Sequence, residues 1–246
     1  MTEAYNMDCM EAMREMPDNA FDLAVVDPPY GGGSQIVQVE RERELRAEAP
    51  KYNGSIAGRF GGRFDRYHLE GSQDRRDLGG EIPAGATGAA DIRHWDVAPP
   101  KEYFRELARV SRNQIIWGGN YFGLPPTRCF LVWKKLTISE TFSMAMAEYA
   151  WTSFNDNAKV FEYAPQGNRE RRFHPTQKPV ALYKWILSRW AKKGDRILDT
   201  HLGSGSSRIA AYDLGLDFVG YEIDEVYFRL QEERFAAHAA QTSLFV

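Results

Sequence analysis

The chain has 246 residues, of which 43% are hydrophobic and 26% are charged, and its formal net charge is -3. This length suits one α/β domain with insertions, and no apolar stretch approaches the roughly 20 residues of a membrane-spanning helix. The near-neutral charge excludes a globally basic nucleic-acid-binding domain, so a contact with DNA would need a local basic patch.

The first third of the sequence predicts two short strands around a helix, followed by an irregular stretch. We expect a strand at residues 4–6 and a helix at 9–16, and the unbroken apolar run at 23–27 predicts a buried strand. From about residue 31 to residue 100 the chain is rich in glycine and in charges of both signs, and only residues 40–48 have a helical composition. Structureless connections longer than about 15 residues are uncommon without a role, so we interpret 31–100 as a functional insertion.

Regular patterns return after the insertion, beginning with a helix at 101–110. After Pro179, apolar side chains recur at helical spacing and predict a second helix, which is expected to stop near Gly194. Of the three strands expected between these helices, the last two should pair antiparallel at one edge of the sheet. These strands are residues 114–117, 129–133 and 148–152.

The last quarter of the sequence alternates strand and helix twice. A βαβα pattern of this kind is typical of a parallel sheet with helices on both faces. We therefore expect a single α/β domain over residues 1–246, with the insertion contributing to recognition of a partner. The alternating segments are residues 196–199, 207–214, 218–222 and 224–240.

The turn after the strand at 196–199 has the features of a site for a nucleotide-like cofactor. Gly203 and Gly205 permit a tight turn and a close approach of the backbone to a ligand. Glu222 ends the next strand, where a carboxylate can accept hydrogen bonds from ribose hydroxyls. Arg208 stands where a pyrophosphate-binding loop has its third glycine, which argues against a nicotinamide or flavin. The alternative is an ordinary tight turn followed by a surface glutamate.

Two segments that follow predicted strands resemble one enzyme family. The first segment is Asp27-Pro28-Pro29-Tyr30, and the second is residues 197–206 (ILDTHLGSGS). Together they resemble the DNA amino-methyltransferases, which modify adenine N6 or cytosine N4, and their order along the chain resembles the permuted beta group. The resemblance implies a Rossmann-like fold dependent on S-adenosylmethionine (SAM), with a mostly parallel seven-stranded sheet, an antiparallel edge hairpin and helices on both faces.

The resemblance also implies a set of residues that bind SAM, whose product would be S-adenosylhomocysteine. Residues 174–179 (HPTQKP) resemble the segment beside the methionine end of the cofactor, and residues 6–9 resemble the segment that holds its adenine. Thr200 and His201 stand where many family members have Pro-Phe. The alternative role of Asp8 is to cap a helix, and that of the two histidines is structural hydrogen bonding. The implied cofactor-binding residues are Asp8, Cys9, Asp27, His174, Thr176, Gln177, Lys178, Asp199, His201, Gly203, Ser204, Gly205, Ser206, Glu222 and Ile223.

The chemistry implied for the first segment is methyl transfer to an exocyclic amine. The amine lone pair is delocalised into the base, so acceptors must draw the nitrogen toward tetrahedral geometry. Asp27 and the Pro28 carbonyl would supply two acceptors, and Pro28 and Pro29 restrict the backbone that carries them. Tyr30 would offer a flat face to a base flipped out of the duplex. Asp27, Pro28, Pro29 and Tyr30 are therefore the expected catalytic residues, and a proline-rich turn is the alternative interpretation.

The first residue of this motif bears on the target base. An initial aspartate resembles the adenine-modifying members, whereas an initial serine is more usual in cytosine-N4 enzymes. We therefore expect a DNA adenine-N6 methyltransferase, with cytosine-N4 or RNA methylation as the nearest alternatives. A non-catalytic DNA-binding or clamp-associated module with the same fold is the alternative from another class, and the intact motif argues against it.

Two arginine clusters are candidates for contact with double-stranded DNA, although each taken alone also fits a solvated surface. Phosphate contacts position a protein and base contacts specify a sequence, so neither cluster discloses a recognition sequence. The clusters comprise Arg59, Arg63 and Arg66 in the insertion, and Arg169, Arg171 and Arg172 before His174.

The end of the chain and its cysteines bear on partners and location. The segment from Gln241 to Phe245 is similar to the short peptide with which several bacterial DNA enzymes bind the sliding clamp, and packing against the domain is the alternative. The family resemblance makes a homodimer a further expectation. Cys9 and Cys129 form no CxxC pair, and no His, Cys, Asp or Glu spacing predicts a metal site. We expect a cytoplasmic, nucleoid-associated protein of a bacterium or a phage-infected host, with a role in DNA methylation such as restriction-modification.

Overall fold

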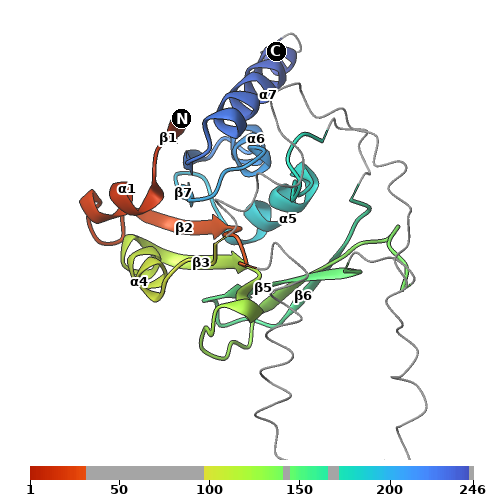
Figure 1. Ribbon diagram of the computed structural model, residues 1–246. Helices are drawn as coiled ribbons and strands as arrows, with labels where there is room; N and C mark the ends of the chain where they lie inside the picture. The colour runs from red at the N-terminus through yellow and green to blue at the C-terminus, as the bar shows by residue number, and fades with distance from the viewer. Residues whose placement is uncertain (32–96, 141–144, 166–171, 244–246) are drawn as a thin grey trace, which may run out of the picture.

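The computed structural model describes residues 1–31, 97–140, 145–165 and 172–243 (Figure 1). Some of the expectations above fall outside these ranges. They are the helix at 40–48, the arginines Arg59, Arg63, Arg66, Arg169 and Arg171, and residues 244 and 245 of the clamp-like segment.

Eight strands in the described part of the chain form a single sheet, in the order β1-β8-β7-β2-β3-β5-β4-β6. Within it, β5 (Ala147–Thr152) runs antiparallel to both of its neighbours, β3 (Ser111–Trp117) and β4 (Phe130–Lys134). All the other neighbouring pairs are parallel. The remaining strands are β1 (Thr2–Asn6), β2 (Phe21–Val26), β6 (Lys159–Glu162), β7 (Arg196–Asp199) and β8 (Asp217–Glu222).

Helices cover both faces of this sheet (Figure 1). Side chains of a strand alternate between faces, and accordingly Leu23 and Val25 of β2 belong to one core and Ala24 and Val26 to the other. The first core is closed by α5 (Val180–Trp190) and α6 (Ser206–Asp213), and the second by α1 (Cys9–Glu15) and α4 (Lys101–Val110). Burial on both faces explains the unbroken apolar run of residues 23–26 in β2. The other helical segments are α7 (Glu225–Ser243) and the 3-10 turn η2 (Gly119–Tyr121).

The expected fold class is confirmed, with three differences in detail. The sheet has one strand more than expected, because β6 pairs with β4 and takes the edge position that the β4–β5 hairpin was expected to hold. Helix α5 ends at Trp190, four residues before Gly194, and a turn closed by the hydrogen bond from the Asp195 N–H to the Lys192 carbonyl follows. Helix α7 continues to Ser243, so Gln241 is helical.

The strand order places the two motif segments side by side. β7 lies between β8 and β2, and Leu23 and Ala24 are in register with Ile197 and Leu198. From β7 the chain passes through α6 to β8 on one side, while from β2 it passes through α4 to β3 on the other. Such a reversal is the switch point at which open α/β sheets bind ligands. No helix in the described ranges is both long enough and apolar enough to cross a membrane.

Candidate active site

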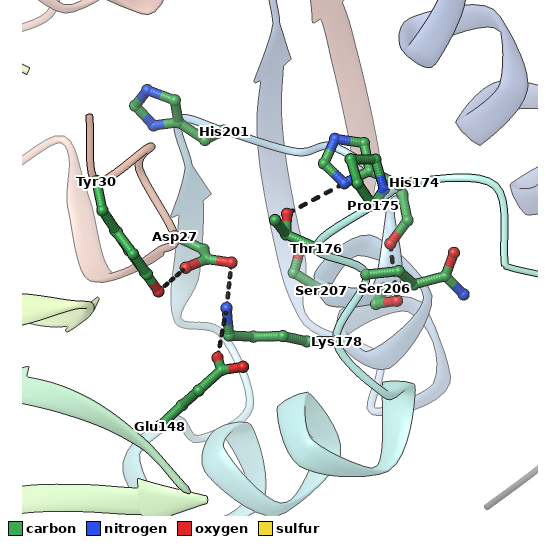
Figure 2. A network of polar contacts seen from close by, with 12 residues as sticks. Asp27, Tyr30, Glu148, His174, Pro175, Thr176, Lys178, His201, Ser206 and Ser207 are labelled. Carbon is green, nitrogen blue, oxygen red and sulfur yellow. Dashed lines mark hydrogen bonds and ion pairs between the residues drawn. The ribbon is translucent and has the colours of Figure 1, made fainter. Parts of the chain in front are cut away.

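Asp27 follows β2 at this switch point, and both of its carboxylate oxygens have partners (Figure 2). The Tyr30 hydroxyl donates to Oδ1 at 2.8 Å, and the Lys178 ammonium pairs with Oδ2. Burial raises the pKa of Asp27, while the ammonium of Lys178 beside it favours the charged form. The Asp27 side chain is 13% exposed, and each carboxylate oxygen can accept a second hydrogen bond. A donor group on a substrate could therefore still reach it.

The ring of Tyr30 occupies a space that a glycine leaves open. Gly118 follows β3 with φ of +68°, and a Cβ atom at this position would lie 2.1 Å from Tyr30 Cε1. Tyr30 also stacks on Tyr121 of η2, with ring centroids 5.0 Å apart and planes inclined by 23°. Tyr121 is 51% exposed, so this pair of rings reaches the surface beside Asp27. A flat aromatic surface next to an acceptor is suited to holding a planar base.

Lys178 connects Asp27 to a second carboxylate, that of Glu148 near the start of β5 (Figure 2). Its Nζ lies 3.1 Å from Glu148 Oε2, and the other oxygen of Glu148 lies 2.6 Å from Lys135 Nζ. Burial opposes ionisation of Glu148, but the two ammonium groups outweigh it and lower its pKa. Burial likewise opposes the charge on Lys178, but Asp27 and Glu148 outweigh it and raise its pKa. Lys135, Glu148, Lys178 and Asp27 thus form a row of four charges of alternating sign, with Asp27 at its end.

Asp199 ends β7 and fixes the loop that follows it. Its Oδ1 accepts the His201 backbone N–H at 3.0 Å and its Oδ2 accepts the Ser207 hydroxyl at 2.5 Å. Burial raises the pKa of Asp199 to about 7, although both hydrogen bonds favour the carboxylate. Asp199 therefore closes the loop onto the first turn of α6.

The Thr200-His201 pair, which departs from the Pro-Phe of many family members, makes hydrogen bonds that Pro-Phe could not. The Thr200 hydroxyl lies 2.6 Å from the Tyr103 hydroxyl and 2.9 Å from His201 Nδ1, and the His201 ring packs edge-on against Tyr103. Burial lowers the pKa of His201 to about 4, so the imidazole is neutral at pH 7. A hydrogen-bonded role, weighed above as an alternative, fits His201.

Gly203, His174 and Glu222 come together where the ends of β7 and β8 meet the segment before α5. The Gly203 N–H donates to Glu222 Oε2 at 2.7 Å, and a Cβ atom on Gly203, whose φ is +50°, would lie 3.3 Å from the His174 ring. Burial lowers the pKa of His174 to about 3, and its Nδ1 lies 3.2 Å from the Thr176 hydroxyl. The other oxygen of Glu222 accepts the Asp224 N–H at 2.9 Å. Both oxygens retain a lone pair for a ligand.

The segment between β1 and α1 closes the other side of this region. Asp8 caps α1, since its Oδ1 accepts the Met10 N–H at 2.8 Å, and the Asn6 side-chain amide donates to the carbonyls of Glu222 and Ile223. Cys9 is buried, which raises the pKa of its thiol to about 12. The Asp8 cap, weighed above as an alternative, is thus observed, and its second oxygen is not used by the cap. In the described ranges, no group of three or more His, Cys, Asp or Glu side chains could hold a metal ion.

Comparisons with known proteins show the family of this chain. The sequence pattern of the DNA methylase family that groups N6 and N4 methyltransferases matches residues 100–233. The Type II methyltransferase M.HpaI of Haemophilus parainfluenzae is 33% identical over 254 aligned positions, which cover 92% of this chain and 71% of that protein. The chain belongs to the DNA methylase family.

Solved structures of other methylases share the fold of this one. The M1.HpyAVI–SAM complex gives a TM-score of 0.54 at 16% identity and covers 95% of this chain and 100% of its own. PvuII DNA methyltransferase, which is cytosine-N4-specific, gives 0.52 at 10% identity, with 96% and 92% covered. These likenesses establish the Rossmann-like architecture of the methylase.

Two arginines that the sequence did not single out as site residues lie next to the glycine loop of the methylase, and Arg234 holds that loop in place. Arg234 of α7 donates to the Ser204 carbonyl at 2.7 Å and lies 3.0 Å from the Ser206 hydroxyl. Arg208 of α6 is buried, pairs with Glu232 at 2.5 Å and lies over the Phe235 ring. Arg208 therefore has a packing role where a dinucleotide-binding loop would have glycine.

The remaining predicted site residues lie on the segment before α5. Gln177 is buried and its Oε1 accepts the Phe173 N–H at 3.4 Å. Arg172 is half-buried, and its guanidinium donates to the carbonyls of Pro175 and Gln177. Burial lowers the pKa of Arg172, with Glu148 opposing the effect. Arg172 thus holds its own loop in this structure, and its contact with DNA stays a prediction.

Sequence reasoning missed Glu148, Lys135, Gly118 and Tyr121 as parts of the site of the methylase. Polar site residues are expected at the carboxyl ends of parallel strands, but β5 runs the other way, so Glu148 reaches the site from the beginning of its strand. A signal for the aromatic part was present, since Gly118 and Tyr121 directly follow the apolar run of β3.

Proposed function

We propose that this methylase is a SAM-dependent adenine-N6 methyltransferase that acts on a base flipped out of duplex DNA. The observation that carries the proposal is the adjacency of β2 and β7, which puts Asp27 and the Tyr30–Tyr121 aromatic pair beside the loop from Asp199 to Gly205. An acceptor for an amine, a surface for a base and a loop for a cofactor thus meet at one edge of the sheet.

The residues around Gly203 fit SAM. Glu222 has free lone pairs for two ribose hydroxyls, and the neighbouring Ile223 is 63% exposed and offers an apolar surface to the adenine ring. The positive φ of Gly203 keeps the loop narrow next to His174. The M1.HpyAVI fold neighbour was solved with SAM, which supports the assignment. When bound, SAM supplies an electrophilic methyl group on its sulfonium.

Asp27 would then act on the incoming amine. Its free lone pair and the Pro28 carbonyl would each accept one amino hydrogen, which localises the nitrogen lone pair toward the methyl group. Acceptors fixed before the reaction need no reorganisation as positive charge develops on the nitrogen, and this is where preorganised polar groups lower a barrier most. Holding the methyl donor and the target nitrogen in line would lower the activation free energy further.

Adenine is the proposed base because the motif begins with aspartate. PvuII DNA methyltransferase shares the fold and is cytosine-N4-specific, so cytosine is the competing target. We further propose that the insertion, through Arg59, Arg63 and Arg66, makes phosphate contacts that position the duplex.

The test is transfer of labelled methyl from SAM to unmethylated duplex DNA, followed by digestion to nucleosides and mass spectrometry. The expected product is N6-methyldeoxyadenosine. N4-methyldeoxycytidine as the product would show that the target base is cytosine instead of adenine. Label found only in an RNA substrate would show that the substrate is RNA instead of DNA. No methylated nucleoside in any substrate, with SAM bound, would overturn the proposed activity.

Replacing Glu222 by glutamine should weaken SAM binding. Hydrogen bonds to a charged group contribute about 1.5–3 kcal/mol, which corresponds to an increase in the dissociation constant of about 10- to 100-fold. Turnover at saturating SAM should change little, since Glu222 ends β8, which β7 separates from the strand that precedes Asp27. Isothermal titration calorimetry measures the affinity, and Glu225→Gln, at an exposed position three residues later, is the control. An unchanged affinity in Glu222→Gln would exclude its contact with the ribose.

A further inference from the structure

The charge network behind Asp27 is more extensive than an acceptor for an amine requires. The side chains of Lys135, Glu148 and Lys178 are 7%, 23% and 3% exposed, yet all three belong to ionisable residues. Buried ion pairs add little to stability, because the cost of removing charges from water offsets their attraction. A role in the chemistry of the neighbouring carboxylate is therefore the better explanation of why they are buried there.

The geometry of the network is that of one ammonium shared by two carboxylates. Lys178 Nζ pairs with Asp27 Oδ2 on one side and lies 3.1 Å from Glu148 Oε2 on the other, and it lies 5.3 Å from the centre of the Trp117 ring. Lys135 balances Glu148 from behind at 2.6 Å, so the two lysines and two carboxylates are neutral in sum. Glu148 is in place because β5 is antiparallel, and its register opposite Trp133 fixes it in the sheet.

We propose that Glu148 is a positioning residue for methyl transfer, which holds Lys178 between two carboxylates and so keeps Asp27 oriented and strongly accepting toward the target amine. This inference rests on the proposed function. Paired with Asp27 alone, the Lys178 ammonium would neutralise that carboxylate and weaken it as an acceptor. Shared with Glu148, it still fixes the position of Oδ2 but leaves more negative charge on Oδ1, the oxygen nearest the aromatic pair.

A dependence on pH follows from the same arrangement. Burial raises the pKa of Asp27 most, the Lys178 ammonium lowers it, and the negative charge of Glu148 raises it further. Removing the charge of Glu148 should therefore lower the pKa of Asp27. The acidic limb of a plot of kcat/KM against pH reports the ionisation of the free enzyme, and it should move to lower pH. The titratable groups around Asp27 come from every neighbouring element and are Tyr30, Tyr103, Lys135, Glu148, Lys178, Tyr183 and Asp199.

The test uses Glu148→Gln in the full chain, which keeps the shape of the side chain and removes its charge. We expect kcat to fall by about 10- to 100-fold, as for other losses of positioning, with the KM for SAM unchanged and the acidic limb displaced to lower pH. The matched control is Glu162→Gln, because Glu162 of β6 forms an exposed 2.7 Å pair with Lys134 in the neighbouring strand. That control should keep both kcat and the pH profile of the parent chain.

Glu148→Gln also leaves the buried Lys135 ammonium without its carboxylate, and an unpaired buried charge can unfold the protein. A second variant removes this effect. The double variant Glu148→Gln, Lys135→Gln removes both charges and should restore thermal stability while kcat stays low and the limb stays displaced. If this folded double variant has the kcat of the parent chain and the acidic limb of its pH profile has not moved, the inference is overturned. That result differs from failure of the proposed function, in which the parent chain itself transfers no methyl group to DNA.

Discussion

Replacing Asp27 by alanine should abolish most methyl transfer and leave SAM binding within a few-fold of the parent chain. Removing one preorganised hydrogen-bonding group from a transition state typically costs about 10²- to 10³-fold in kcat, and Asp27 also orients Tyr30 through a 2.8 Å hydrogen bond. Single-turnover transfer to DNA measures the loss, and calorimetric titration with SAM measures binding.

The variant is expected to fold, because Lys178 keeps its ion pair with Glu148 at 3.1 Å when Asp27 is removed. Asp27→Asn is a second variant that retains the shape of the side chain and one acceptor oxygen, and it should lie between alanine and the parent. Full methylation by Asp27→Ala, with thermal stability preserved, would mean that another group accepts the amine hydrogens.

Replacing Gly118 by alanine should displace Tyr30 and damage binding of the target base. The added Cβ would lie 2.1 Å from Tyr30 Cε1, and the ring has to leave its stack with Tyr121 and its hydrogen bond to Asp27. Base–aromatic stacking contributes about 1–3 kcal/mol, so we expect kcat/KM for DNA to fall by roughly 10- to 100-fold. SAM affinity should not change, because the proposed cofactor loop follows β7 whereas Gly118 follows β3.

The chain provides a close control for this experiment. Gly123 has φ of +62°, nearly that of Gly118, but a Cβ atom there meets nothing within 4 Å. Gly123→Ala therefore imposes the same backbone strain, about 1–2 kcal/mol for a left-handed residue, without touching Tyr30. If both alanine variants lose stability and DNA methylation equally, the strain alone explains the effect and the aromatic surface has no role in base binding.

Much of the fold could be predicted because the apolar runs of this chain are strongly patterned. Strands β2 and β7 were expected within two residues, and each is buried on both faces, so burial and local preference agree. Strand β6 was not expected; it lies at the edge of the sheet with Val160 59% accessible, so its place depends on pairing with β4 rather than on burial of an apolar run.

The site was predictable only where it follows the ends of parallel strands. Asp27, Asp199 and Glu222 were identified from that rule, and the structure places all three at the same edge of the sheet. The rule does not apply to Glu148, whose strand is reversed, and no local pattern reveals that Lys178 lies between two carboxylates more than 100 residues from one of them. Contacts of this kind depend on sheet order, which is not a local property of sequence.

The direct pairing of β2 with β7 has a consequence for how donor and acceptor can move. Neighbouring strands lie about 4.8 Å apart in the hydrogen-bonding direction, and the residues Leu23 and Ala24 are held opposite Ile197 and Leu198 by the main chain. The separation between the strand end that carries Asp27 and the strand end that carries Asp199 is thus fixed by backbone spacing, and side chains only adjust what is held there. Heating or surface substitution should leave that separation unchanged, and loops can diversify around it without altering the reach of the transfer step.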